Sequence, residues 1–162
     1  MTNPFAILID VADAVVAELN AGNTAGSFSK TFVATRTYDT DLELEASAAS
    51  ALSVNVAFGV PVIEKATVVR DRIVCPVDIA VRQQVLVSNT TACDALVEFS
   101  GELWAYLAGS GTDGFPRVLS AYNTAAWEDP DREHAPWPYV PDILKESNQF
   151  VSILHTFYVV HA

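Results

Sequence analysis

The three histidines are the residues of this sequence best suited to acid–base or metal chemistry. His134 lies in the stretch DREHAPW beside Asp131 and Glu133, a grouping that resembles a metal or acid–base cluster. The HExxH spacing of zinc hydrolases is absent, so a solvated polar loop is the favoured interpretation. His155 interrupts an apolar run and is expected to be a hydrogen-bonded sheet residue, while His161 is expected to be exposed.

Motifs for nucleophilic catalysis or phosphate binding are also missing. Ser110 in AGSGTDG is not part of a GxSxG elbow, and it follows a helical pattern instead of a strand. The glycines at 109–114 come after that helix, with no Lys-Ser or Lys-Thr behind them. Cys75 and Cys93 have no Cys or His at metal-ligand spacing and are expected to be free thiols. The sequence therefore predicts no catalytic residue, no metal site and no cofactor, and we expect a protein that is not an enzyme.

A row of alternating acids is the first candidate for a partner interface. If the stretch is extended, its four carboxylates lie on one side at a spacing of roughly 7 Å. A solvated face, a salt-bridging partner surface and a divalent-cation site are all compatible with such a row. The acids are Asp39, Asp41, Glu43 and Glu45.

Aromatic residues in a proline-containing stretch are the second candidate. Trp127, Trp137 and Tyr139 have side chains of the kind that anchor protein interfaces. Tryptophans also cover hydrophobic cores, and the sequence does not decide between the two roles.

Composition limits the class of protein. The chain has 162 residues, of which 51% are hydrophobic and 18% charged, so it has enough apolar side chains for one folded domain and is not disordered. The net charge of −11 and the scattered Lys and Arg residues argue against a DNA-gripping surface. The N-terminal stretch lacks a basic segment, and no apolar run is long enough to span a bilayer, so a soluble protein made in the cytosol is expected.

The N-terminal half predicts one helix followed by strands. Asn3 as cap, Pro4 at the first position and Gly22 just past the end delimit a helix. Its apolar stripe consists of Ile7, Val11, Val15 and Leu19. Strands are expected over 28–38, 52–58 and 68–82, with a bulge or a sheet edge at Pro76 because proline cannot donate to the ladder.

The C-terminal half predicts a helix, a long loop and a final strand. The helix is expected over 91–108 with Thr91 as its cap, and 117–127 could be a strand. Residues 128–142 are expected to form a long irregular loop before a buried strand over 150–161. The order indicates an α+β single domain, with a mostly antiparallel sheet and two main helices packed on it.

Several of these stretches, taken together, resemble a family of tailed-bacteriophage neck proteins, the tail-terminator or tail-completion proteins. The resemblance covers nearly the whole chain as a pattern of elements. An acidic segment and the short strand LSVNVAFG precede a long strand, and a polar step at Gln149, Phe150 and Ser152 opens the last strand. The matching stretches are DTDLELEA, LSVNVAFG, RDRIVCPVDIAVRQQV, ACDALVEFSGELWAYLAG and FVSILHTFYVV.

The resemblance implies a structural subunit without chemistry. Members of the family assemble as a six-fold ring on the head-proximal end of the tail tube, where they stop polymerisation and present a docking surface to the head connector. It thus implies a virion protein, assembled in the host cytoplasm, whose partners are its own copies, the tail tube protein and the head–tail connector protein. DNA would pass through such a ring without specific binding.

Other functions stay open on the sequence alone. The chain could be another head-completion or minor virion protein, a small ligand-binding domain or enzyme, or an assembly factor outside any phage. The sequence favours the neck ring.

Overall fold

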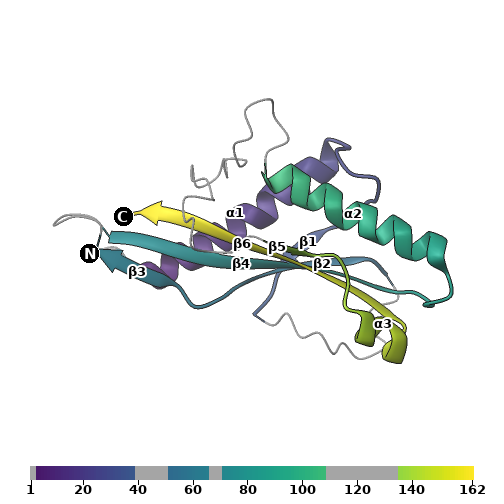
Figure 1. Ribbon diagram of the computed structural model, residues 1–162. Helices are drawn as coiled ribbons and strands as arrows, with labels where there is room; N and C mark the ends of the chain where they lie inside the picture. Colours follow the sequence, from purple (N-terminus) through teal and green to yellow (C-terminus); the bar gives the residue numbers. More distant parts are fainter. Residues whose placement is uncertain (1–2, 39–50, 66–70, 109–134) are drawn as a thin grey trace.

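The computed structural model describes residues 3–38, 51–65, 71–108 and 135–162, without the side chains of 135–137 (Figure 1). Within these residues the chain forms three helices and six strands. In chain order they are α1 (Pro4–Thr24), β1 (Ala34–Arg36), β2 (Ser53–Phe58), β3 (Val62–Lys65), β4 (Asp71–Gln84), α2 (Thr90–Ala108), β5 (Ala135–Trp137), α3 (Pro141–Ser147) and β6 (Gln149–His161).

The strands form one mostly antiparallel sheet. Its order is β1-β2-β4-β6-β5, and β3 pairs with β4 beyond the end of β2. Among the described strand pairs, the short β1–β2 pair alone is parallel. The helices α1 and α2 lie on the same face of this sheet (Figure 1), so the expected α+β class with two main helices is confirmed.

The first helix begins as the sequence predicts but ends later. The Asn3 side chain accepts hydrogen bonds from the backbone N–H groups of Phe5 (3.0 Å) and Ala6, and Pro4 occupies the first turn. The expected end at Gly22 is wrong, because the helix continues to Thr24. The left-handed residue is Gly26 (φ 75°), and the bonds from Gly26 and Ser27 back to Asn23 and Gly22 form a Schellman end.

Gly22 has a packing role in place of the expected stop. A Cβ atom at this position would lie 2.7 Å from Cζ of Tyr106 and 2.9 Å from the Phe28 ring. The missing side chain therefore lets α2 approach α1 closely.

The strand expected over 28–38 is shorter than predicted. Only Ala34–Arg36 pairs as a strand. The residues before it are bound to α1: Asn23 bonds both backbone groups of Phe32, and Asn20 bonds both backbone groups of Ala34 at 2.8 and 3.1 Å. Helix side-chain amides thus replace a neighbouring strand.

Strand β4 is central, so its proline is not at an edge, but pairing is interrupted on one side of it. The register with β6 runs without a break through Pro76↔Phe157. On the other side, the carbonyl of Pro76 accepts from the N–H of Gly59 (2.9 Å), in the gap between the pairings of β2 and β3. In that gap the three residues 59–61 lie opposite the two residues 75–76, so the expected bulge is present, with its extra residue in the neighbouring chain. Proline is tolerated because its missing N–H would point into the gap.

Helix α2 begins one residue before its predicted start. The Asn89 side chain accepts the N–H of Ala92 at 3.2 Å, so Asn89 caps the helix where Thr91 was expected to do so. The apolar stripe of this helix is buried and consists of Leu96, Phe99, Leu103 and Leu107.

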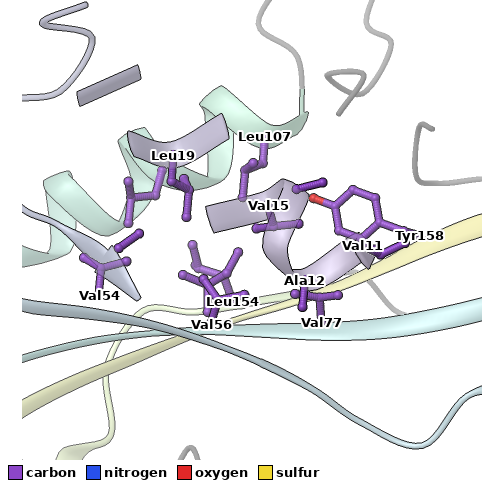
Figure 2. Close-up of a cluster of buried hydrophobic side chains, with 14 of the residues drawn as sticks. Val11, Ala12, Val15, Leu19, Val54, Val56, Val77, Leu107, Leu154 and Tyr158 are labelled. Atoms are coloured by element: carbon purple, nitrogen blue, oxygen red, sulfur yellow. The ribbon is translucent and has the colours of Figure 1, made fainter. Parts of the chain in front are cut away.

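The core lies between the helices and the sheet. Figure 2 shows Val11, Val15 and Leu19 of α1 facing the strand side chains Val54, Val56 and Leu154. The α1 stripe is buried as predicted. The residues of β4 that face this core are Ile73, Cys75, Val77, Ile79 and Val81.

The predicted loop 128–142 contains regular structure where it is described. Its residues 135–137 form β5, which pairs with β6, and α3 begins at Pro141. The helix has Asp142 in its first turn and Lys145 in its last turn, and Asn148 ends it in the left-handed conformation (φ 51°). The sequence pattern did not predict this helix, because seven residues are too few to show a helical period of apolar side chains. The final strand forms as predicted, one residue longer at its start.

Candidate functional site

A groove of about 420 Å³ lies where α3 meets the N-terminal half of α2. Val87 and Val97 line one side, Tyr139 and Leu144 line the other, and Phe150 of β6 is also part of the lining. Most lining atoms are therefore apolar.

Several apolar side chains at the groove are exposed to solvent. Tyr139 is 41% exposed, Val87 is 50% exposed and Val97 is 37% exposed. Leu86, which precedes Val87, is 61% exposed. Contiguous exposed apolar side chains on a folded protein mark surfaces that bind a partner or a ligand. This groove is the strongest candidate site in the described part of the chain.

Few polar groups are available in the groove for chemistry. Thr90, Cys93, Asp94 and Lys145 are its polar lining residues. The Cys93 thiol contacts the carbonyl oxygen of Leu86 at 3.9 Å and is half-buried. Since no basic group is hydrogen-bonded to that sulfur within the described residues, the arrangement supports binding more than nucleophilic catalysis.

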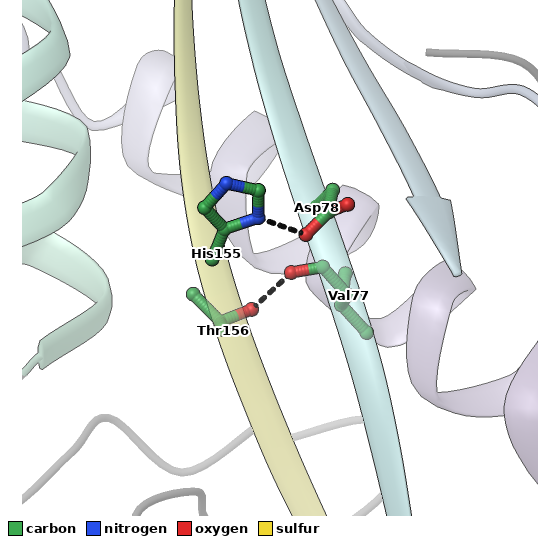
Figure 3. A network of polar contacts seen from close by, with 4 residues as sticks. All are labelled: Val77, Asp78, His155 and Thr156. Carbon is green, nitrogen blue, oxygen red and sulfur yellow. Dashed lines mark hydrogen bonds and ion pairs between the residues drawn. The ribbon is translucent and has the colours of Figure 1, made fainter. Parts of the chain in front are cut away.

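A second polar feature lies on the sheet face opposite the helices. Asp78 of β4 and His155 of β6 are cross-strand neighbours, and their side chains meet at 2.8 Å between Oδ1 and Nδ1 (Figure 3). Both side chains are more than a third exposed. The expectation of a hydrogen-bonded sheet histidine is confirmed.

The Asp78–His155 pair lacks the further groups that an acid–base site needs. An aspartate orients a catalytic histidine whose other ring nitrogen activates a nucleophile. Within the described residues no hydroxyl or thiol is bonded to that nitrogen. The nearby hydroxyl of Thr156 is buried on the helix face and donates to the carbonyl of Val77 at 2.6 Å (Figure 3). The pair is best described as a cross-strand contact that stabilises the β4–β6 register.

The predicted interface residues have different outcomes. The acidic row Asp39, Asp41, Glu43 and Glu45 lies outside the described residues, and so does Trp127. Trp137 pairs through its backbone with Ile153 in β5–β6, and its side chain is not described. Tyr139 alone is placed in the groove.

Sequence reasoning missed most of the groove. Leu86 and Val87 follow a strand, and Val97 lies outside the apolar stripe of α2, so no local pattern marks them as part of a site. The available signal was the run VLV at 85–87, three apolar residues in a row after the polar end of β4. Only the fold shows that this run, α2 and α3 meet.

No group of three or more His, Cys, Asp or Glu side chains is arranged to hold a metal ion among the residues that the structure describes. In the same part of the chain, no helix is both long and apolar enough to cross a membrane.

Comparison with known proteins assigns no family. No protein-family model matches the chain, and no curated protein matches it.

Proposed function

We propose that this chain is a structural subunit of a tailed-phage neck ring, which terminates the tail tube and joins the tail to the head connector. The observation that supports the proposal best is the exposed apolar groove between α2 and α3, since a protein that works by assembly needs such a surface. The architecture, with two helices on one face of the sheet, is compatible with the sheet backed by helices that is typical of the family the sequence resembles.

A neck-ring subunit needs surfaces for its own copies and for two other proteins. Copies of the chain would form a six-fold ring in the virion, with the tail tube protein on one side and the head–tail connector protein on the other. The net charge of −11 suits a ring through which DNA passes without binding, because phosphate backbones are repelled by acidic surfaces.

Electron microscopy of lysates from a phage that lacks this gene tests the proposal. We expect DNA-filled heads beside unattached tails, many of them overlong, because no ring would stop the tube. Supplying the intact gene from a plasmid should restore joined particles of normal tail length.

Two results would count against the neck ring. Normal infectious particles from the phage that lacks this gene would exclude the neck-ring role. Tails of normal length beside defective or leaking heads would assign the chain to head completion instead.

A small ligand-binding domain is the second candidate, and the groove volume favours it. About 420 Å³ lies within the range of ligand pockets, roughly 300–1,000 Å³. Native mass spectrometry of protein purified from its host would show a constant added mass if this function were correct.

A further inference from the structure

Strand β1 forms one margin of the sheet, and its outer side has backbone groups that a further strand could bind. Within the described residues no strand pairs with this side of β1. The N–H of Thr37 donates to the carbonyl of Val56 at 2.8 Å, so alternate residues of the segment direct their backbone groups towards β2. The backbone groups of Phe32 and Ala34 therefore point away from β2, to the side where a strand would add.

Two asparagines of α1 bind these outward backbone groups. The Asn20 side chain accepts the N–H of Ala34 at 2.8 Å and donates to its carbonyl at 3.1 Å. The Asn23 side chain accepts the N–H of Phe32 at 3.3 Å and donates to its carbonyl at 2.8 Å. An antiparallel neighbour would exchange the same pair of bonds with a residue of the edge. We name Asn20 and Asn23, with these four bonds, the amide clamp.

An ion pair extends the contact between α1 and this margin. The Nε atom of Arg36 donates to Oδ1 of Asp13 at 2.7 Å. Asp13 lies about two turns before Asn20, so the side chains that reach β1 come from one flank of α1. The Arg36 and Asp13 side chains are 27% and 56% exposed, and an ion pair this open contributes little. The amide clamp is therefore the main closure of the margin.

The sequence at this margin is prone to pair with another strand. The run FVATR at 32–36 is rich in aromatic and β-branched residues. Val33 is 70% exposed, and Thr35 is exposed as well. Solvent thus reaches one face of the segment, and edges of this kind add strands from other chains when their backbone groups are unbonded.

The opposite margin of the sheet is protected by a different feature. Strand β5 has only three residues, and the middle one is Pro136, which pairs with Leu154. Short edge strands and prolines both discourage the addition of a strand. No proline is present in β1, so its margin depends on bonds from α1.

We propose that the amide clamp is an inhibitory contact that closes the β1 margin to a further strand, and that a chain without the clamp pairs through β1 with β1 of a second copy. The side-chain amides satisfy the backbone groups that such pairing would need. The inference is independent of the neck function, because it concerns a contact that the fold suppresses and is tested with purified protein.

The test removes the clamp and compares it with the same substitution elsewhere. The variant is Asn20→Ala combined with Asn23→Ala. The matched control is Asn89→Ala, which also removes a side-chain bond to the backbone, here the one to Ala92 at the start of α2 (3.2 Å), far from any sheet margin. Sedimentation velocity measures association over a range of concentrations, and NMR measures exchange of individual backbone amides.

The double variant should behave differently in dilute and in concentrated solution. When dilute, it should exchange the amides of Phe32 and Ala34 on the order of ten times faster than the wild type. When concentrated, it should associate and protect both amides again, because a second β1 replaces the clamp. Adding Val33→Lys should reduce association, since a charge at an edge opposes pairing. Adding Val97→Glu, at the groove, should not.

Three results would overturn the proposal. The double variant could keep the association state of the wild type while both amides exchange fast at every concentration, which would limit the clamp to positioning residues 32–34. Asn89→Ala could associate equally, which would attribute association to lost stability. Association could also respond to Val97→Glu and not to Val33→Lys, which would place it at the groove. If circular dichroism shows the double variant unfolded, Asn20→Ala alone gives the same test at Ala34, because Asn23 still binds Phe32.

Discussion

The two cysteines illustrate how position alone sets the reactivity of a residue. Cys75 faces the core from the central strand and has no exposed surface. Burial raises the pKa of its thiol to about 12, because a thiolate would be desolvated there. Cys93 lies in the open groove and is only half-buried. Since the thiolate is the nucleophile, the two residues should differ strongly towards alkylating reagents.

We expect one thiol per chain to react with a maleimide in the native protein. Cys93 should be labelled quickly at neutral pH, and Cys75 only when the protein unfolds. Because the pKa of Cys75 is raised, its neutral form is retained as the pH rises from about 9 towards 12. Peptide mass spectrometry after timed labelling, with and without denaturant, measures both sites. Equal native labelling of the two cysteines would mean that the core around β4 opens readily.

At the scale of helices and strands, Gly22 and Gly101 are both helical glycines, so a change to alanine can be compared in crowded and in open surroundings. Gly22 lies in α1 against the Tyr106 ring, where a Cβ would come within 2.7 Å. The ring cannot move away easily, because its hydroxyl donates to the Glu18 carbonyl (3.3 Å) and Phe28 packs on it. Gly101 lies in α2 with nothing within 4 Å of its would-be Cβ.

We expect Gly22→Ala to destabilise the fold and Gly101→Ala to stabilise it. Overpacking costs about 1–3 kcal/mol, whereas replacing a helical glycine by alanine gains about 1 kcal/mol. The first effect outweighs the second only at Gly22. Urea denaturation of both variants measures the free energies of unfolding. Stabilisation by Gly22→Ala would show that α2 can shift away from α1 at no cost.

The elements that sequence predicted well are those whose pattern is local. The stripe Ile7, Val11, Val15 and Leu19 predicts a helix because its period is set within one segment. The strand at 28–33 was wrong because Asn20 and Asn23, on another element, bind that backbone instead of a neighbouring strand. The irregularity at Pro76 was predicted from proline's missing N–H, but its position between β2 and β3 was not, because it depends on where those two strands end and begin.

The candidate site was predictable only through Tyr139. An aromatic residue in a proline-containing stretch is a known anchor type, and the structure places it in the groove. The other groove residues come from three separate segments, and no local pattern reports that Val97 of α2 and Leu144 of α3 share one surface. The acidic row at 39–45 stays a prediction, because it lies outside the described residues.

At the scale of the whole molecule, net charge should control how readily copies meet. Each chain carries a charge of −11 at pH 7, so two copies repel each other at distances longer than the contact itself. A contact that covers the groove between α2 and α3 would be mainly apolar, and salt does not weaken apolar contacts.

We therefore expect association between copies to strengthen as salt is added. Between about 0.01 and 1 M salt the Debye length falls from about 30 Å to about 3 Å, which removes the long-range repulsion and leaves the apolar contact. Sedimentation velocity of the purified protein over this range should show an average sedimentation coefficient that rises with salt. A coefficient that falls with salt would mean that ion pairs, and not apolar contacts at the groove, supply most of the binding free energy between copies.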